Sequence, residues 1–331
     1  MAKALGPAVW AHNLRKVYRV AEKEPGFVGT LRHFVRRRYR EVEAVRGVSF
    51  VIEPGEIVGF LGPNGAGKTT TLKMLTGLIY PSGGELEVLG HVPYRREAAF
   101  LRQITLVMGN KQQLIWDLPV LDSLRINAAV YEIDPAEARR RTRAFAELLE
   151  IEDILTQPVR KLSLGQRMKA ELMASLFHLP RLLFLDEPTL GLDVNAQAAV
   201  RHFLRDYRER YGATMLLTSH YMADIEALAE RVLVIHRGAL LHDGDLGRLV
   251  ERFAPFKEVR LELATPADPA ALADLGEVAE ASGRRVRLLV TKERLTRTVA
   301  ELLARFEVRD LGVTEPPLED VIARVFSEGR V

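Results

Sequence analysis

The nine residues at positions 62–70, GPNGAGKTT, constrain the fold of this chain more than any other stretch. An apolar run at 57–61 precedes them, and the residues LKML after them indicate the start of a helix. The order strand, glycine-rich loop, helix is the context in which the pattern G-x-x-x-x-G-K-[ST] binds phosphate. A glycine-rich turn can match this pattern by accident, but the flanking strand and helix favour a nucleotide-binding loop.

The residue types in this loop explain why it would bind a phosphate chain. Glycine at 62, 65 and 67 allows backbone angles that other residues avoid, so that successive N–H groups can surround an anion. The N-terminus of the following helix adds partial positive charge. Lys68 would supply a point charge to the β- and γ-phosphates, and the Thr69 hydroxyl would hold Mg²⁺. The predicted nucleotide-binding loop comprises Gly62, Pro63, Asn64, Gly65, Ala66, Gly67, Lys68, Thr69 and Thr70.

Composition narrows the class of protein. The 331 residues leave room for two domains, and 47% hydrophobic residues are enough for packed cores. A net charge of +3 gives no reason to expect nucleic-acid binding. Without cysteine the chain has no disulfide, thiol nucleophile or cysteine metal site, which fits a reducing compartment. Residues 1–10 lack a signal-peptide pattern, and no stretch approaches the roughly 18 apolar residues of a membrane helix, so we expect a soluble, cytoplasmic protein.

Apolar strands alternate with helical patterns along most of the chain, which predicts an α/β fold with a mostly parallel sheet covered on both faces. We expect one large domain over residues 1–250, with a helical subdomain inserted at about 112–178. Its strands are predicted at 9–20, 45–52, 57–61, 85–89, 101–108, 181–185, 214–218 and 231–236. Residues 255–331 predict a smaller α/β domain, with strands at 259–263, 286–290 and 308–313 and helices at 269–275, 295–306 and 318–326.

An arginine-rich insertion at residues 21–43 separates the first two predicted strands. Leucine, phenylalanine, valine and tyrosine alternate there with basic residues, which include Arg36, Arg37 and Arg38. One interpretation is a solvated insertion with a basic helical face. The other is a short amphipathic helix that rests on a membrane surface or on a membrane partner. The sequence leaves both interpretations open.

Two carboxylates follow the apolar strand at 181–185, at the end where ligands bind in open α/β sheets. We expect Asp186 to hold Mg²⁺ and Glu187 to act as the general base toward an attacking water. Paired acids after a strand can also cap a helix, but the phosphate loop upstream favours the catalytic interpretation.

Three further residues are candidates for the same site. His220 comes directly after the strand predicted at 214–218. A lone histidine in such a place is more often structural. Beside a γ-phosphate, however, it could donate a hydrogen bond and orient the water. Asp193 lies on the turn after the two carboxylates and could reach across an interface. Tyr18 offers an aromatic face on which an adenine could stack.

Taken in order, four parts of this chain resemble the nucleotide-binding subunit of an ABC transporter: the loop at 62–70, the pentapeptide LSLGQ at 162–166, the run at 183–193 and His220. The pentapeptide discriminates, because many P-loop ATPases share the first loop and the acidic strand. The resemblance extends over about residues 8–245.

This resemblance implies an ATPase that uses ATP and Mg²⁺ and works as a dimer of identical or paralogous copies. Each ATP would lie between the phosphate loop of one copy and the pentapeptide of the other, where Ser163, Gly165 and Gln166 would contact the nucleotide. Ser163 can donate from its hydroxyl, and Gly165 lets backbone N–H groups approach a γ-phosphate at a helix N-terminus. Asp193 would communicate across the same interface. Lys68, Glu187 and His220 are all present, which favours an active enzyme over an inactive binding module.

One element departs from the family's pattern. After the strand at 101–108, the family places a glutamine that touches Mg²⁺ and relays to the membrane subunit, and here Asn110 stands at that place. Asparagine is one methylene shorter, so its reach to the metal is left open. Gln112 or Gln113 could replace it if the loop shifts. The apolar stretch at 114–119 is expected partly in the core and partly against the membrane partner.

Within this family the chain looks most similar to the ATPases of ABC-2 type exporters, of the drug and sodium export kind. Residues 109–119, the insertion at 21–43 and the C-terminal run at 315–321 support that similarity. It implies a bacterial ATPase at the inner face of the cell membrane that drives separate integral membrane permease subunits. Two alternatives are the ATPase of a polysaccharide exporter, whose extra C-terminal domain would be a β-sandwich, and a soluble ABC protein of translation or DNA repair.

Overall fold

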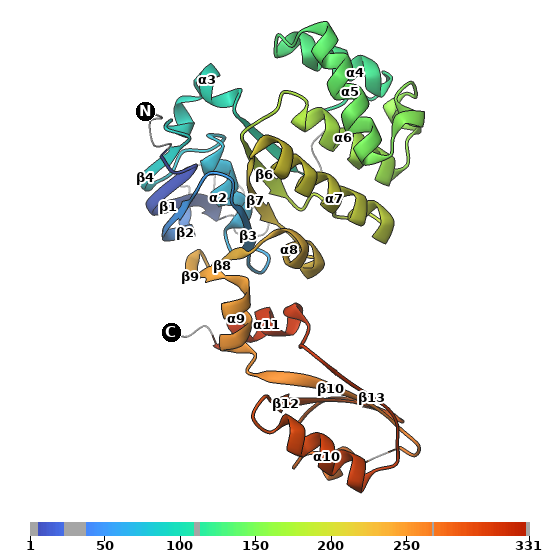
Figure 1. The fold of residues 1–331 in the computed structure, drawn as a ribbon. Coiled ribbons are helices and arrows are strands. Elements are labelled where there is room, and N and C mark those ends of the chain that lie inside the picture. Colours follow the sequence, from blue (N-terminus) through green and yellow to red (C-terminus); the bar gives the residue numbers. More distant parts are fainter. Residues whose placement is uncertain (1–5, 23–37, 109–112, 267, 329–331) are drawn as a thin grey trace, which may run out of the picture. The chain divides into compact units, whose positions relative to one another are not determined.

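The computed structural model describes residues 6–22, 38–108, 113–266 and 268–328 (Figure 1). Internal contacts divide the chain into two compact units, Met1–Gly244 and Asp245–Val331. Each unit has a hydrophobic core of its own. None of the described helices is long and apolar enough to cross a membrane.

The centre of the larger unit is a six-stranded sheet of β3 (Ile57–Leu61), β5 (Ile104–Met108), β6 (Leu182–Asp186), β7 (Thr214–Thr218), β8 (Arg231–His236) and β9 (Ala239–Asp245). The strand order is β5-β6-β7-β3-β8-β9, and the four pairs from β5 to β8 are parallel. Every residue of β3 and β7 is buried, which explains their largely apolar sequences. The carboxyl ends of β3, β6 and β7 therefore meet at one edge of the sheet.

A second sheet in the larger unit is antiparallel, with β1 (Val9–Glu22) between β2 (Arg38–Ile52) and β4 (Gly83–Val88). The predicted insertion at 21–43 is therefore too long, because its two ends belong to β1 and β2. Tyr18 pairs with Val42 and Ala21 with Tyr39, so the two strands continue together well beyond the predicted ends. Residues 23–37, on which the prediction of an amphipathic helix rests, lie outside the described residues.

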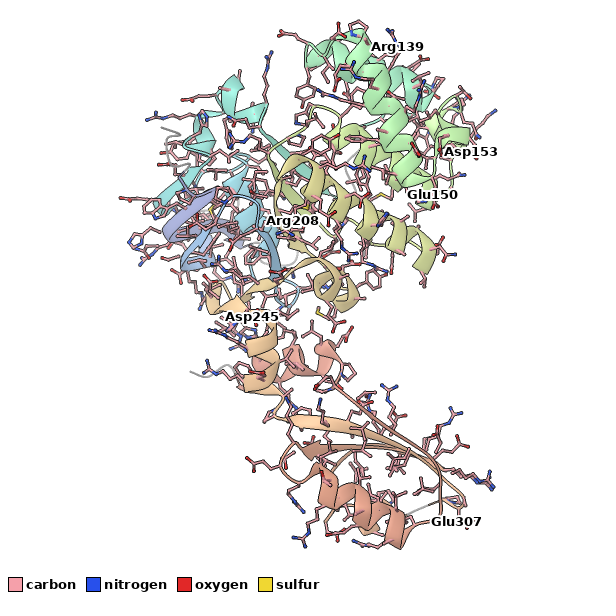
Figure 2. All side chains as sticks on the ribbon, viewed as in Figure 1. Arg139, Glu150, Asp153, Arg208, Asp245 and Glu307 are labelled. Atoms are coloured by element: carbon pink, nitrogen blue, oxygen red, sulfur yellow. The ribbon has the colours of Figure 1, made fainter. Side chains whose placement is uncertain are left out.

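The described helices of the larger unit are α2 (Lys68–Leu75), α3 (Ala98–Leu101), α4 (Val120–Val130), α5 (Pro135–Leu149), α6 (Leu164–Leu176), α7 (Val194–Tyr211) and α8 (Met222–Leu228), with short 3₁₀ turns η1 (Pro93–Arg95), η2 (Glu152–Ile154) and η3 (Val159–Lys161). Figure 1 shows α4, α5 and α6 grouped together beside the sheet. The labelled charged residues Arg139, Glu150 and Asp153 project from this group in Figure 2. The strand predicted from residue 101 starts at 104, because α3 and a turn occupy the positions before it.

Local sequence signals explain where these helices begin and end. Asp134 accepts hydrogen bonds from two backbone N–H groups of the first turn of α5, and Pro135 occupies its first position. At the other end of a helix, α7 is followed by Gly212, whose φ of 63° is left-handed. Arg208, labelled in Figure 2, donates from Nε to the carbonyl oxygen of Gly55 at 3.0 Å. That bond holds α7 against the turn that precedes β3.

The smaller unit is built on an antiparallel sheet of β10 (Phe256–Leu263), β11 (Glu277–Ser282), β12 (Arg285–Thr291) and β13 (Val308–Thr314), in the order β11-β12-β10-β13. Its helices are α9 (Leu246–Phe253), α10 (Leu295–Arg305) and α11 (Leu318–Glu328). The core of this unit unites one face of the sheet with α10, and includes Val259, Leu261, Leu288 and Leu302. A single antiparallel sheet with helices differs from a β-sandwich, which has two stacked sheets.

The helix predicted at 269–275 is wrong, since only the 3₁₀ turn η4 (Pro269–Ala271) forms there. Leu272 and Leu275 are spaced like one face of a helix, but both are buried in the core of the smaller unit. At Gly276 the backbone approaches β12 so closely that an added Cβ would lie 2.9 Å from the carbonyl oxygen of Leu289. The chain therefore turns into β11, a strand that the sequence pattern did not predict.

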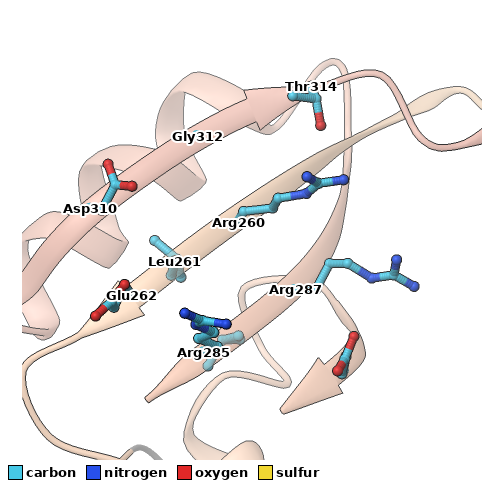
Figure 3. A pocket seen from close by; sticks show the side chains of 10 residues that line it. Arg260, Leu261, Glu262, Arg285, Arg287, Asp310, Gly312 and Thr314 are labelled. Carbon is cyan, nitrogen blue, oxygen red and sulfur yellow. The ribbon is translucent and has the colours of Figure 1, made fainter. Parts of the chain in front are cut away.

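Charged side chains cover the opposite face of this sheet, where they line a depression of about 650 Å³ (Figure 3). Arg260 lies there beside Arg287, and both form ion pairs with the fully buried Glu258. The acidic residues Glu262, Glu280 and Asp310 line the same depression. Because charges of both signs are interspersed, this face offers no uniform potential to a ligand.

Candidate active site

The predicted phosphate loop, residues 62–70, joins β3 to α2. Gly65 and Gly67 have φ of 78° and 110°, a region that side chains with a Cβ rarely occupy. Gly62 meets a different constraint, because a Cβ there would lie 2.4 Å from the carbonyl oxygen of Ile235 on β8. The loop thus needs glycine at 65 and 67 for backbone conformation and at 62 for space.

Lys68 is the first residue of α2, and its side chain folds back over the loop that precedes it. Its Nζ donates to the carbonyl oxygens of Gly62 at 2.5 Å and Pro63 at 3.2 Å. Only 8% of the residue is exposed. Burial lowers the pKa of Lys68, and the negative charges of Glu187 and Asp186 oppose part of that shift. The ammonium group is therefore placed at the mouth of the loop, within the field of two carboxylates.

Thr69 and Asp186 come together where the loop meets the end of β6. The Thr69 hydroxyl donates to Asp186 Oδ2 at 3.1 Å, and the Thr218 hydroxyl donates to Asp186 Oδ1 at 2.8 Å. A hydroxyl and a carboxylate fit Mg²⁺, which is commonly bound by one or two carboxylates together with substrate phosphates. Within the described ranges, no three His, Asp or Glu residues form a cluster that could hold a metal ion by themselves.

Glu187 and His220 face each other across the ends of β6 and β7. Their side chains lie 2.8 Å apart, measured from Glu187 Oε1 to His220 Nε2. Glu187 has a left-handed backbone with φ of 56°, and its N–H donates to the carbonyl oxygen and the hydroxyl of Thr218, at 3.1 Å each. We refer to residues 187–193 as the glutamate loop and to residues 219–221 as the histidine loop. Adjacent parallel strands thus bring a carboxylate and an imidazole to the same edge as the phosphate loop.

The pentapeptide at 162–166 begins α6 with a reciprocal cap. The Ser163 hydroxyl accepts from the N–H of Gln166 at 3.2 Å, and Gln166 Oε1 accepts from the N–H of Ser163 at 3.0 Å. Gly165 stands between them in the first turn. Ser163 is exposed, so its hydroxyl is accessible at the N-terminus of a helix of 13 residues. Its hydrogen bonds are local, and the structure does not join it to the phosphate loop.

Comparison with known proteins assigns the larger unit. Residues 45–190 match the family described as "ABC transporter". The chain is 33% identical over 219 residues to the ABC transporter ATP-binding protein NatA of Bacillus subtilis (strain 168), covering 65% of this chain and 89% of that protein. This chain belongs to the ABC transporter family. The larger unit is an ABC ATPase domain.

Other ABC proteins extend the comparison. The chain is 37% identical over 217 residues to the Nod factor export ATP-binding protein I of Burkholderia pseudomallei (strain 1710b), covering 66% of this chain and 71% of that protein. A solved ATP-binding subunit of an ABC transporter superimposes with a TM-score of 0.61 at 25% identity, over 74% of this chain and 93% of that one. Residues 255–314 match the "EvrA-like ABC transporter, C-terminal domain". The predicted α/β fold and ABC family are thus confirmed.

Two other predicted site residues, Asp193 and Tyr18, lie outside the cluster described above. Asp193 caps α7, because its Oδ1 accepts from the N–H of Ala196 at 2.9 Å. Tyr18 is partly exposed on β1, with Lys16 Nζ 5.1 Å from its ring centroid. Asn110 lies outside the described residues, so its relation to the metal stays a prediction.

Thr218 is a site residue that sequence reasoning missed. It is fully buried, and its hydroxyl bonds both the carboxylate of Asp186 and the backbone of Glu187. Its signal in the sequence is its place as the last residue of a buried strand, one position before Ser219-His220. A threonine at the end of a strand is too common to be assigned a role without its neighbours.

Proposed function

We propose that this ABC protein is the ATP-binding and ATP-hydrolysing subunit of a bacterial exporter of the ABC-2 type, driving separate membrane permease subunits. The observation that carries the catalytic part is the 2.8 Å contact between Glu187 and His220 beside the phosphate loop. The export part is supported by the relatives, which include a Nod factor export ATP-binding protein and NatA. The transported molecule is determined by the permease subunits rather than by this chain.

The geometry suggests a role for each residue in hydrolysis. The phosphate loop would bind the β- and γ-phosphates through its N–H groups, with Lys68 neutralising their charge. Thr69 and Asp186 would hold Mg²⁺, which when bound supplies positive charge against the phosphate oxygens. Glu187 Oε1 would accept a proton from the attacking water. His220 Nε2 would donate toward the γ-phosphate, and its contact with Glu187 would keep both groups on the same water.

The pentapeptide at the start of α6 supports a head-to-tail dimer. Ser163 is exposed and is hydrogen-bonded only within its own cap, so it is available to a ligand held by another copy. In the proposed dimer, each ATP lies between the phosphate loop of one copy and Ser163, Gly165 and Gln166 of the other. Asp193, at the N-terminus of α7, would lie along the same interface. The partner copy would be identical or paralogous.

Exposed apolar side chains support contact with a membrane subunit. Ile115 and Trp116 are 45% and 43% exposed although both are large and apolar. The guanidinium of Arg167 on α6 lies 5.6 Å from the ring centroid of Trp116, so the tryptophan is held in a defined place. We propose that these residues face the permease, with the ATPase at the cytoplasmic side of the membrane. The basic residues between β1 and β2 would add contact with the lipid surface.

The smaller unit favours this function over a polysaccharide exporter. A sugar-binding C-terminal domain of that class would be a β-sandwich, whereas this unit has one antiparallel sheet and three helices in the part that is described. Binding to nucleic acid or ribosomes is not expected from a net charge of +3.

Affinity purification from native membranes tests the export function. We expect a polytopic membrane protein to co-purify and to change the rate of ATP turnover. The double variant Ile115→Ser with Trp116→Ser tests the proposed contact. It should reduce that co-purification, while the ATP turnover of the isolated subunit stays unchanged. Recovery with ribosomes or DNA and without a membrane protein would leave the ATPase in place and contradict the export function.

A further inference from the structure

A buried carboxylate joins the glutamate loop to the histidine loop. Asp224 lies in the first turn of α8 and is only 1% exposed. Its Oδ2 accepts hydrogen bonds from the hydroxyls of Thr189 at 2.5 Å and Ser219 at 2.7 Å. Its Oδ1 accepts from the guanidinium of Arg201 on α7 at 2.8 Å. One side chain therefore connects four separate segments of the chain.

The positions of these partners matter for catalysis. Thr189 lies two residues after Glu187 in the glutamate loop, and Ser219 directly precedes His220 in the histidine loop. Both hydroxyls bond the same oxygen of Asp224, so the two loops are held at a fixed separation. A shift of either loop would break one of these buried hydrogen bonds, which costs about 1–3 kcal/mol when the partner is left unsatisfied.

The hydrogen-bond partners of Asp224 are groups that can all donate to a carboxylate. The Ser219 hydroxyl accepts from the N–H of Tyr221 at 3.0 Å, so its single proton is free to be donated to Asp224. Thr189 donates its own proton to the same oxygen. Arg201, with 18% of its side chain exposed, supplies the compensating positive charge. An amide nitrogen in the place of Oδ2 could accept from neither hydroxyl, and one in the place of Oδ1 could not accept from Arg201.

The sheet constrains the catalytic pair only in part, through the hydrogen bonds from the N–H of Glu187 to Thr218 at the end of β7. Glu187 and His220 both lie beyond the last residues of their strands, and Glu187 has a left-handed φ of 56°. Their side chains are 24% and 42% exposed, so packing alone does not fix the 2.8 Å contact between them. A small displacement at a reacting centre can cost a large factor in rate.

We propose that Asp224 is a positioning residue for ATP hydrolysis. Its carboxylate ties the glutamate loop to the histidine loop, and thereby keeps Glu187 Oε1 and His220 Nε2 aligned on the attacking water. Asp224 touches neither of these side chains and acts through Thr189 and Ser219. This inference rests on the ATPase activity of the proposed function.

The test compares the turnover number with the affinity for ATP. Asp224→Asn is expected to lower kcat by about tenfold or more, since the loss arises in the transition state. Affinity for a fluorescent ATP analogue should change by less than about threefold, because Lys68 and Thr69 are untouched. Thr189→Val, which preserves the ion pair of Asp224 with Arg201, should lower kcat in the same way. Thr189→Ser, which restores the hydroxyl, should return kcat to near the wild-type value.

Arg205→Ala is the matched control for a purely structural role. Arg205 also joins α7 to α8, through a hydrogen bond to the carbonyl oxygen of Ala227 at 2.9 Å, but it contacts neither loop. Its loss should leave kcat near the wild-type value. A second control combines Asp224→Asn with His220→Ala. Because both changes act on the contact between Glu187 and His220, Asp224→Asn should lower the kcat of the His220→Ala variant by less than about a further twofold.

Three results would overturn the positioning role: kcat of Asp224→Asn within about twofold of wild type, an equal loss of kcat in Arg205→Ala, or losses that multiply fully in the His220→Ala background. Each of these three results is compared with the kcat of wild type and with the kcat of Glu187→Gln. The loss of turnover in Glu187→Gln tests the ATPase function separately. If wild type turns over, the positioning role alone is at stake. If wild type does not turn over, the proposed function fails, and this inference fails with it.

Discussion

Single residues in the phosphate loop are constrained by space as much as by backbone conformation. Gly62 illustrates the first, since the carbonyl oxygen of Ile235 leaves no room for a Cβ. Gly67 is constrained by both, with φ of 110° and the carbonyl oxygen of Ala44 at 2.5 Å from an added Cβ. The two positions differ in cause, although the sequence pattern presents them alike.

Gly62→Ala is therefore expected to reduce the free energy of unfolding, because β3 and β8 must separate to accept the methyl group. Overpacking of this kind typically costs about 1–3 kcal/mol. Urea unfolding measures the change. Gly312→Ala on β13 is the matched control, since its Cβ would meet nothing within 4 Å and its φ is not left-handed. Equal stability of the two variants would contradict the packing argument.

Part of the candidate site could be predicted from residue types and their spacing in the sequence. The rest became evident only from contacts in the structure. The loop at 62–70 and the acids after β6 are unusual combinations in a fixed order, so the sequence points to them directly. Thr218 and Asp224 are ordinary residues at a strand end and in a first helical turn. Thr218 bonds residues 31 and 32 positions away, and Asp224 bonds Thr189 and Arg201, which lie 35 and 23 positions away. Only the folded structure brings these partners together.

At the scale of elements, a half-buried histidine joins the end of α6 to the sheet and to α4. His178 Nε2 lies 3.2 Å from the carbonyl oxygen of Ile104 on β5, and its ring stacks on Tyr131 with centroids 4.1 Å apart. Burial lowers the pKa of His178 to about 4. The folded structure therefore holds this imidazole neutral and uses it as a hydrogen-bond donor.

Acid should weaken this junction. Because the pKa of His178 is lower in the folded protein than its ordinary value of 6.5, its contribution to stability is complete above about pH 6.5 and is lost as the pH falls toward about 4. His178→Gln retains a donor for Ile104 and removes the titration. We expect its unfolding free energy to fall less steeply over this range than that of wild type.

Chemical unfolding at a series of pH values measures that slope. His202→Gln is the control, since His202 is a largely exposed histidine on α7. A His178→Gln variant with the same pH dependence as wild type would contradict the assigned role.

Elements were predictable where burial alone determines the sequence. The strands β3, β6 and β7 are short apolar runs, and their positions agree with the sequence-based prediction. The start of β2 was missed because residues 39–43 are largely polar and exposed, and they form a strand only through their register with β1. The turn at η4 was mistaken for a helix because the spacing of Leu272 and Leu275 fits both structures.

At the scale of the whole molecule, the proposed function requires the ATPase to meet a membrane. Arg36 and Arg37 lie between β1 and β2, and Arg38 is the first residue of β2, so this segment is strongly basic. Polybasic segments are attracted to anionic lipid by about 1 kcal/mol for each basic residue. We therefore propose that this basic segment contacts lipid headgroups.

Reversing these three charges to glutamate should weaken binding to vesicles that contain anionic lipid, as measured by co-sedimentation at low salt. Arg139, Arg140 and Arg143, exposed on α5, provide a control with the same change in net charge. Binding to anionic vesicles should fall in the first variant and stay near wild type in the second. Unchanged binding in the first variant would favour a solvated insertion.

The most direct test of the central claim is ATP turnover in Glu187→Gln. General-base catalysis typically contributes about 10²–10⁴ in rate, so we expect kcat to fall by at least about a hundredfold while ATP still binds. Because the ATP is then not hydrolysed, light scattering should detect a stable ATP-bound dimer. Glu209→Gln, an exposed position on α7, should behave as wild type. Undiminished turnover in Glu187→Gln would contradict the catalytic role of the Glu187–His220 pair.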